Sequence, residues 1–567
     1  MTKILKGKKY SVLILLLSLL FPFALVAQQT ISGKVTDTDL FPLDGVTVNL
    51  KTTGHSTKTN KEGIYSFSGV ISTVGTLVFS HIGFVKKEVP VNPNTGIYNI
   101  QMVKQENELD NVVVVGYGTT RRRDLTGAVG NVKMNDLAKA PVASFEDALA
   151  GRVAGVQVTS VDGQPGSNNQ IVIRGGNSIT QSNTPLYVID GFPIEIPDNN
   201  AINPEEIESI EILKDASSTA IYGARGANGV IMITTKKGKL SVPVVTYNGW
   251  YGFQKNIKQQ EVMSAYEFVK YQLELSPTIY TPVYFNNGKT LESYRNVPGI
   301  NWQNEILRTA PMQNHALSLR GGNDKTRYSL SGSVVDQKGI IINGGFKRYQ
   351  GRITIDQTIN SRVKAGVTTN YSYTSTYGQI ARTGFDNVGN PSTYLFYSAW
   401  GYRPVTGNDV NDASFLDDPF DLGLSSVDDL RINPLQGAKN KYNKTFANTL
   451  LANAYIEYNF LNDFNLRITG GITQNTRKNE VFNNSKTPAG SPVTVYGALN
   501  GINGSITNFN NNSWLNENTL TYKKRLNDHS LEVLGGFTLQ QNVVNVNGFT
   551  STLIPNEALG IINRLDI

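Results

Sequence analysis

Cysteine is absent from this chain of 567 residues, and histidine occurs only four times. Without thiols, disulfide bonds and thiolate metal sites are excluded. The histidines are far apart in the sequence and show no metal-ligand spacing; they are His55, His81, His315 and His529. We therefore predict neither a metal site nor another cofactor.

Charged residues are also scarce, at 17% of the chain, against about 25% in typical soluble domains. Glycine, asparagine, serine, threonine and tyrosine are plentiful, which is typical of a β-rich, turn-rich protein. Part of the formal net charge of +7 comes from four lysines before residue 10. The other basic residues are spread out, apart from Arg121–Arg123, so the sequence does not indicate nucleic-acid binding.

Long apolar runs are missing except at the N-terminus. Four lysines precede an uncharged, leucine-rich run from Ser11 to Leu25, and Ala27 suits cleavage before Gln28. Residues 1–27 are therefore predicted to be a secretory signal peptide; Pro22 and the short apolar core argue against an uncleaved anchor. No later stretch approaches about 18 consecutive apolar residues. A secreted chain without such helices can still enter a membrane as a closed β-barrel.

Residues 28–104 predict a small all-β domain. Short alternating strands are separated by turns rich in glycine, asparagine, aspartate and proline; they read TISGKVTD, DGVTVNLK, GIYSFSG, GTLVFSHIGF, KKEVPV and YNIQM. A segment of this length can form a two-sheet sandwich. Nothing in it looks catalytic, and we interpret it as a folded spacer or docking module.

Residues 105–123 form a boundary in which a polar stretch leads into four valines, Val112–Val115. Gly116, Gly118 and three arginines follow. The valine run is either a buried strand or an exposed strand whose free edge offers unpaired N–H and C=O groups to a partner.

Residues 124–240 predict a mixed α/β unit. Ser144 has the features of an N-cap for a helix over 144–153, and Asn203 with Pro204 suits a second helix start. The stretch Glu208–Gly238 reads as strand, short helix, glycine-rich turn and strand. Phosphate binding is the alternative for this stretch, but no Gly-Lys-Ser/Thr follows the glycines and the G-x-G-x-x-G spacing is absent.

Residues 241–567 predict a series of about ten-residue strands with alternating polarity, the pattern of transmembrane β-strands. A soluble sandwich gives the same alternation, but it does not explain why tight turns alternate with long polar loops such as 257–312 and 377–444. The tight turns are expected at 321–324, 359–362, 461–464 and 526–529. The strands are expected near 244–256, 313–322, 325–338, 346–359, 361–376, 445–460, 463–477, 512–525 and 528–542.

Nine strands is an odd number, whereas bacterial single-chain barrels have even numbers. We therefore expect 241–567 to be the truncated N-terminal part of a barrel. The predicted fold is mainly β: a sandwich, a small α/β domain and an incomplete antiparallel barrel.

Four segments between residues 149 and 238 carry a family resemblance. LAGRVAGVQV, IRGGNS, PLYVIDG and ILKDASSTAIYGARGANGVIMITTKKG together resemble the plug domain of SusC/RagA-type TonB-linked outer-membrane transporters. The sandwich resembles the carboxypeptidase-regulatory-like domain that precedes many such transporters in Bacteroidetes. The resemblance implies that 124–240 is a plug inside a barrel of 22 strands, with the sandwich in the periplasm.

The same resemblance implies a function and partners. The protein would import a bulky nutrient, a glycan or a peptide, across the outer membrane under a lid formed by a SusD-like surface lipoprotein, and would not be an enzyme. The periplasmic protein TonB would pair by strand addition with a TonB box at Asp110, Asn111, Val112, Val113, Val114 and Val115.

Charged plug residues are candidates for ion pairs that lock the plug to the barrel wall: Arg174, Glu208, Glu211 and Arg225. The alternative is that they are ordinary solvated charges of the plug surface. The sequence assigns no substrate-binding residue.

Three other functions stay open. A TonB-dependent siderophore or metal-chelate receptor shares the plug and barrel but needs no lipoprotein lid. A surface adhesin or structural barrel that moves nothing needs no TonB box. A secreted β-rich binding protein would not enter the membrane.

Overall fold

The structure is a computed structural model. It describes residues 29–38, 40–52, 54–70, 75–92, 96–103, 112–115, 118–121, 129–132, 144–160, 163–167, 169–194, 200–378, 395–405, 432–461, 463–492, 494–526 and 529–557. The predicted signal peptide, Asp110 and Asn111 lie outside these residues. The chain divides into two compact units, Met1–Asn111 and Val112–Ile567, and each is described by itself.

The first unit is the predicted β-sandwich. One sheet has the order β4-β1-β7 and the other the order β3-β2-β5-β6. Alternate residues of facing strands, among them Val35, Val48, Tyr65 and Phe79, are buried between the sheets. The strands are β1 Gln29–Thr36, β2 Thr47–Leu50, β3 Ser56–Lys58, β4 Ile64–Val70, β5 Gly75–Ser80, β6 Lys87–Val91 and β7 Ile100–Gln101.

The second unit begins with a two-stranded ribbon, in which β8 (Val112–Val115) pairs antiparallel with β9 (Gly118–Arg121). The plug follows, with a five-stranded sheet of order β10-β15-β16-β13-β14 and a separate β11–β12 pair. Within the five-stranded sheet, β13 and β16 run parallel and the other neighbours antiparallel. The strands are β10 Val129–Val132, β11 Val156–Thr159, β12 Gln170–Ile173, β13 Leu186–Ile189, β14 Phe192–Ile194, β15 Ile207–Leu213 and β16 Val230–Thr235.

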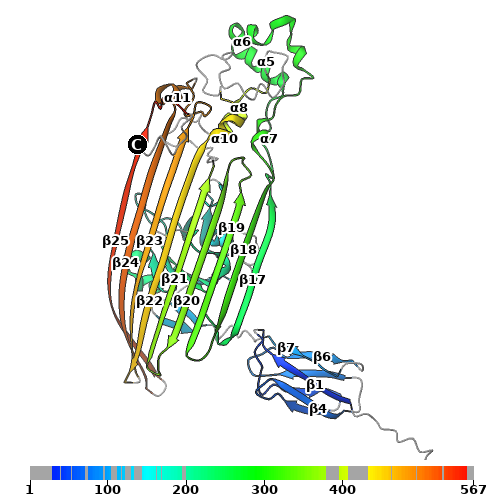
Figure 1. Cartoon of the computed structure of the whole chain (residues 1–567), viewed down its shortest axis with the longest axis vertical. Coiled ribbons are helices and arrows are strands. Elements are labelled where there is room, and N and C mark those ends of the chain that lie inside the picture. The colour runs from blue at the N-terminus through cyan, green and yellow to red at the C-terminus, as the bar shows by residue number, and fades with distance from the viewer. Residues whose placement is uncertain are drawn as a thin grey trace, which may run out of the picture. The chain divides into compact units, whose positions relative to one another are not determined.

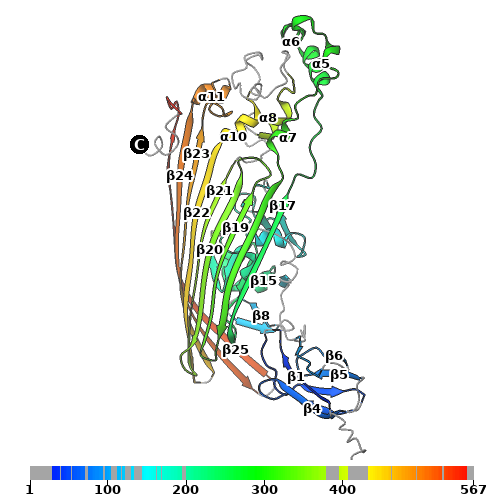
Figure 2. The same ribbon diagram turned by 45° about the vertical axis from the view of Figure 1, so that its right-hand side comes forward.

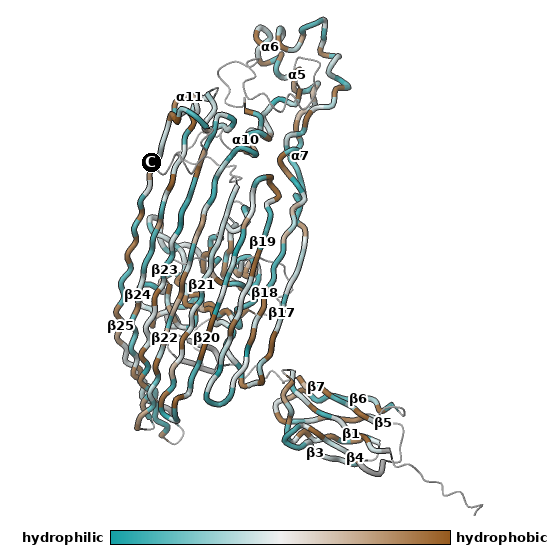
Figure 3. Tube along the Cα trace, viewed as in Figure 1, coloured by the Kyte–Doolittle hydropathy of each residue, from teal (hydrophilic) through white to brown (hydrophobic). Residues whose placement is uncertain are grey.

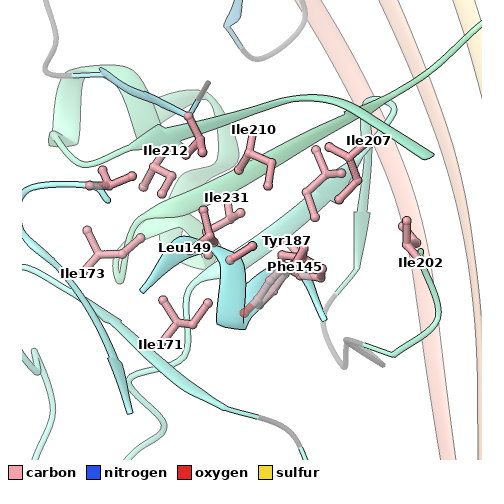
Figure 4. Packing of buried hydrophobic residues seen from close by; sticks show 14 residues of the cluster. Phe145, Leu149, Ile171, Ile173, Tyr187, Ile202, Ile207, Ile210, Ile212 and Ile231 are labelled. Carbon is pink, nitrogen blue, oxygen red and sulfur yellow. The ribbon is translucent and has the colours of Figure 1, made fainter. Parts of the chain in front are cut away.

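Isoleucines of β12, β15 and β16 form the plug core with the short helix α3 (Phe145–Leu149), as Figure 4 shows. Ser144 caps α3 as predicted, because its hydroxyl accepts a hydrogen bond from the Asp147 N–H. The prediction of a helix over 144–153 was too long. The chain turns at Gly151, whose φ of +71° lies in the left-handed region.

The glycine-rich stretch folds as predicted, into β15, the helical turns α4 (Ala216–Thr219) and η3 (Ala220–Gly226), and β16. Gly223, with φ +60° and ψ −146°, breaks the helical turn, a conformation in which other residues are strained. Upstream, Asn203 caps the 3₁₀ turn η2 (Pro204–Glu206).

A nine-stranded antiparallel sheet forms the rest of the unit, with neighbours in chain order (Figure 1). We call this sheet the wall. Every predicted strand occurs. Most extend beyond the predicted range, because residues next to the loops also pair with the neighbouring strand through backbone hydrogen bonds. The strands are β17 Ser241–Gln254, β18 Ala310–Gly322, β19 Thr326–Lys338, β20 Gly345–Thr358, β21 Val363–Tyr377, β22 Tyr442–Phe460, β23 Phe464–Asn483, β24 Asn503–Leu526 and β25 His529–Ser551.

One end of the wall carries the four predicted tight turns and the other carries the helices (Figure 1). The long connection between β17 and β18 is largely helical, with buried aromatic residues such as Tyr284 and Trp302. The connection over 339–344 is short, an exception to the expected long loops at this end. The helices are α5 Ala265–Leu275, α6 Pro277–Tyr284, η4 Asn286–Gly288, η5 Leu291–Tyr294, α7 Trp302–Ile306, α8 Leu395–Gly401, α10 Pro434–Asn440 and α11 Val495–Asn500. None of the helices in the described part of the chain is long and apolar enough to cross a membrane.

The wall is curved, and the plug lies against its concave face (Figures 1 and 2). Many side chains that point toward the plug are polar and buried, such as Gln350, Arg352 and Asn370; Leu451 and Leu515 are apolar exceptions. Side chains on the convex face are often apolar and exposed, such as Ile353 and Val367. Figure 3 shows hydrophobic and hydrophilic residues alternating along the strands of the wall. A soluble sandwich buries its apolar face, so this inverted pattern favours the predicted membrane wall.

Candidate functional site

The plug segment Asn200–Glu206 is held by buried hydrogen bonds to strands β18–β21; we call it the support segment. The Asn203 N–H donates to the Gln350 side chain at 2.8 Å, and the Asn370 amide donates to the Ala201 carbonyl at 3.0 Å. The Ser331 hydroxyl donates to Glu206 at 2.8 Å. A buried polar group that loses its partner costs about 1–3 kcal/mol, so these bonds fix the segment firmly.

Glu205 completes the support segment. The Asn314 amide of β18 donates to its carboxylate at 2.6 Å. Burial raises the pKa of Glu205, and the hydrogen bonds from Asn248 and Asn314 oppose that shift. The first residue of the support segment is also held to the wall, because the Arg348 guanidinium donates a hydrogen bond to the Asn200 carbonyl at 3.4 Å.

A buried ion pair joins the plug to β20. Arg352 lies 2.5 Å from the Asp190 carboxylate, and the two side chains are 3% and 4% exposed. Asp190 also accepts hydrogen bonds from the backbone and hydroxyl of Thr235, and Arg352 contacts the same hydroxyl. Removing one member of such a pair costs about 3–5 kcal/mol because the other charge stays buried.

Sequence reasoning missed this pair, although each member carries a signal. Asp190 closes the strand β13 in an Asp-Gly turn, with φ +51°. Arg352 is a charged residue at an inward position of a transmembrane strand, where charges are expected to have partners. The pairing of the two requires the tertiary structure.

The four predicted lock residues lie in different environments. Arg174 contacts Asp215 and donates to the Lys214 carbonyl, so its described contacts stay within the plug. Arg225 donates to Gln540 of β25 and so reaches the wall. Glu208 is exposed on β15.

Glu211 is the fourth of these residues. Its side chain is buried, with the residue 4% exposed, and one carboxylate oxygen has no hydrogen-bond partner among the described residues. Burial accordingly raises its pKa. The folded protein therefore favours the protonated, uncharged form of Glu211 over the carboxylate.

The valine strand is paired on one side. Val112 lies opposite Arg121 and Val115 opposite Gly118 in the β8–β9 ribbon. Among the described strands, no other strand pairs with β8. Within the described strands the second edge of β8 carries no ladder, and strand addition uses an edge of this kind.

A cavity of about 540 Å³ lies between the plug and strands β22–β25. Val188 and Asp190 line it from the plug, with Met232, Ile233 and Thr234 of β16. The wall contributes mostly polar and charged side chains: Glu457, Asn459, Asn465, Arg467, Thr469, Glu517, Thr519, Thr521, Lys523 and Glu532. Within the described ranges, no group of three or more histidine, cysteine, aspartate or glutamate side chains could hold a metal ion.

Two family models match the chain. Residues 31–114 match the CarboxypepD_reg-like domain, and residues 121–230 match the TonB-dependent Receptor Plug Domain. These matches identify the sandwich and the mixed α/β unit as the predicted domains.

Curated relatives extend the similarity over the wall. The chain is 34% identical to TonB-dependent receptor P26 of Formosa agariphila over 96% of this chain and 51% of the relative. It is 32% identical to TonB-dependent receptor SusC of Bacteroides thetaiotaomicron over 90% of this chain and 50% of the relative. The chain thus spans about half the length of these relatives.

The fold is also found in a solved structure. The RagAB peptide importer in its 'open-open' state matches 80% of this chain and 51% of that chain with a TM-score of 0.64 and 24% identity. The sequence-based identification of the family and of the fold is confirmed by these findings together.

Proposed function

We propose that this chain, which belongs to the SusC/RagA-type TonB-dependent receptors, forms the plug-bearing part of an energised importer in the outer membrane. The observation that carries the proposal is the polar concave face of the wall, which binds a plug through buried contacts, combined with an apolar convex face. A barrel with this arrangement faces lipid outside and is blocked inside. Opening such a barrel requires a partner that supplies energy to move the plug.

The valine strand is the proposed point of energy coupling. TonB would add a strand to the open edge of Val112–Val115, or displace β9 from the other edge, through main-chain hydrogen bonds. Asp110 and Asn111 complete the proposed TonB box. Arg174, Glu208, Glu211 and Arg225 remain lock candidates, and Arg225 is favoured because it contacts β25.

A glycan is the proposed cargo, with a SusD-like lipoprotein as the lid over the helical end of the wall. Homology to SusC over 90% of the chain supports this assignment. A peptide is the second candidate, because the RagAB importer of the same fold is described as a peptide importer. No bond of the cargo needs to break, so we propose that the protein is not an enzyme.

A siderophore receptor is the competing function. The ferrienterobactin receptor of Escherichia coli is 26% identical over 54% of this chain. The SusC-type relatives match more closely and over nearly the whole chain, and they favour the nutrient importer. Iron-limited growth that depends on this protein would favour the siderophore receptor.

Proline substitutions in the valine strand test the proposal. Consecutive residues of a strand direct their N–H groups to opposite edges, and proline removes the N–H. Of Val113→Pro and Val114→Pro, one therefore weakens pairing with β9 and the other blocks the open edge. We expect the variant blocked at its open edge to lose at least tenfold in glycan uptake and in TonB cross-linking.

The controls are Val113→Thr and Val114→Thr, which keep both the N–H and the β-branched shape; they should retain uptake. Full uptake by both proline variants would contradict TonB coupling at this strand.

A further inference from the structure

The plug is attached to the two sides of the described wall in different ways. Toward β18–β21 the contacts are directional and buried: the Asp190–Arg352 ion pair and the hydrogen bonds of the support segment. Toward β22–β25 they include an apolar cluster of Phe192 and Ile194 with Leu451 and Leu515. Two polar contacts are added on this side: Arg225 donates a hydrogen bond to Gln540, and Tyr222 interacts electrostatically with Glu517 of β24.

These two kinds of contact respond differently to a pull on the plug. A buried ion pair or hydrogen bond has a fixed partner geometry, and separating it exposes a charge or polar group that has no new partner. Apolar contacts are non-directional and tolerate sliding. The plug therefore yields more readily along β22–β25 than along β18–β21.

The cavity lies on the side that yields. Its plug surface comes from the ends of β13 and β16, and its wall surface comes from β22–β25. Four of the charges on its wall form two ion pairs: Lys523 lies 3.1 Å from Glu532 and Arg467 lies 3.8 Å from Glu457. Paired charges beside asparagine and threonine side chains offer donors and acceptors to an uncharged, hydroxyl-rich solute without leaving an ion unpaired.

We infer that the nutrient passes between the plug and strands β22–β25, through this polar cavity, while the support segment and the Asp190–Arg352 pair hold the plug to β18–β21. This inference rests on the proposed import function. The plug then behaves as a door hinged on β18–β21, and it does not leave the barrel as one body. The cavity becomes the first part of the opened path.

Two glycine–phenylalanine contacts provide a matched test, one on each side. A Cβ atom added at Gly471 of β23 would touch the Phe192 ring, and one added at Gly166 of the plug would touch the Phe346 ring of β20. The double variant Phe192→Cys/Gly471→Cys places one cysteine on the plug and one on β23, and the double variant Gly166→Cys/Phe346→Cys places one on the plug and one on β20. A short cleavable bis-maleimide linker can join the two cysteines of each variant. The chain contains no other cysteine.

Glycan uptake is measured in the native outer membrane before linking, after linking and after cleavage of the linker. Uptake that depends on TonB in the unlinked wild type tests the proposed function first, and its absence would overturn that function independently. Given such uptake, we expect the 192–471 link to lower it at least tenfold and cleavage to restore it. We expect the 166–346 link to leave uptake within twofold of its own unlinked level.

Three results would overturn the inference. Inhibition by both links would show that the plug detaches from β18–β21 as well. Inhibition by the 166–346 link alone would place the path on the opposite side. Uptake through both linked forms would show that the plug moves relative to neither side, so that the path lies elsewhere.

Discussion

Strands β4 and β20 have the same period-two pattern but bury opposite kinds of residue. In β4 of the sandwich, the inward residues Tyr65 and Phe67 are buried, at 2% and 6% exposure. In β20 of the wall, Arg352 is buried at 3% exposure and its neighbour Ile353 is 48% exposed. Alternation therefore identifies a two-faced strand, and it does not say which face meets the solvent.

The difference lies in the solvent of the outer face. The sandwich is surrounded by water, so apolar side chains gain free energy by turning inward. In the proposed membrane location the wall has lipid outside and a polar plug inside, so polar side chains turn inward, and several of them find hydrogen-bond partners on the plug.

The largest expected effect comes from the interior of the wall. Arg352→Ala leaves the Asp190 carboxylate buried without its cation, which we expect to destabilise the plug by about 3–5 kcal/mol. Urea-induced release of the plug in native membranes, followed by protease accessibility, measures the change. Adding Asp190→Asn should recover part of the loss because it removes the uncompensated charge.

Arg362→Ala is the matched control, since Arg362 is exposed beside the tight turn that precedes β21; it should change the urea midpoint little. A loss after Arg352→Ala no larger than the loss after Arg362→Ala would show that the buried pair does not hold the plug.

The wall was predictable strand by strand, but its inner contacts were not. Alternation and tight turns place all nine strands, because both are local properties of the sequence. Asp190 and Arg352 are 162 residues apart, and no local pattern relates them. The helices between β17 and β18 were missed because they build a small core of their own within an apparently polar loop.

A second prediction compares two isoleucines with equal exposure. Ile353 on the convex face of β20 is 48% exposed, and Ile64 at the start of β4 is 50% exposed. Ile353→Arg should destabilise the barrel by about 2–4 kcal/mol, the cost of a charge at the lipid face near mid-membrane. Ile64→Arg should cost less than about 0.5 kcal/mol, as usual for a solvated surface.

Unfolding midpoints in urea, measured in lipid vesicles for the wall and by hydrogen exchange for the sandwich, provide the comparison. Equal costs at the two positions would mean that the convex face does not meet lipid, and the secreted binding protein would regain support.

Only part of the candidate site could be predicted from the sequence. The valine strand stands out by composition, and among the described strands it pairs only with β9. The lock candidates were chosen by charge alone, which does not distinguish Arg174, paired within the plug, from Arg225, which reaches β25. The position of a plug charge depends on the sheet order, which the sequence does not reveal.

The smallest expected effect concerns Glu211, a buried carboxyl in the plug. Its pKa is raised in the folded state by burial, so folding favours the protonated form. Below the ordinary glutamate pKa of about 4.3, the folded and unfolded states are both protonated and Glu211→Gln should match the wild type. As the pH rises through the raised pKa, the wild type loses stability and the glutamine variant does not.

Glu211→Gln should therefore raise the urea midpoint of plug release at pH 7 and leave it unchanged at pH 4. The control is Glu208→Gln on the same strand, where the side chain is exposed and the midpoint should stay constant at both pH values. A lower midpoint for Glu211→Gln at pH 7 would mean that the charged carboxylate has a stabilising partner. Glu211 would then gain support as a lock residue, because a carboxylate that stabilises the plug only when ionised needs a cation or hydrogen-bond donors beside it.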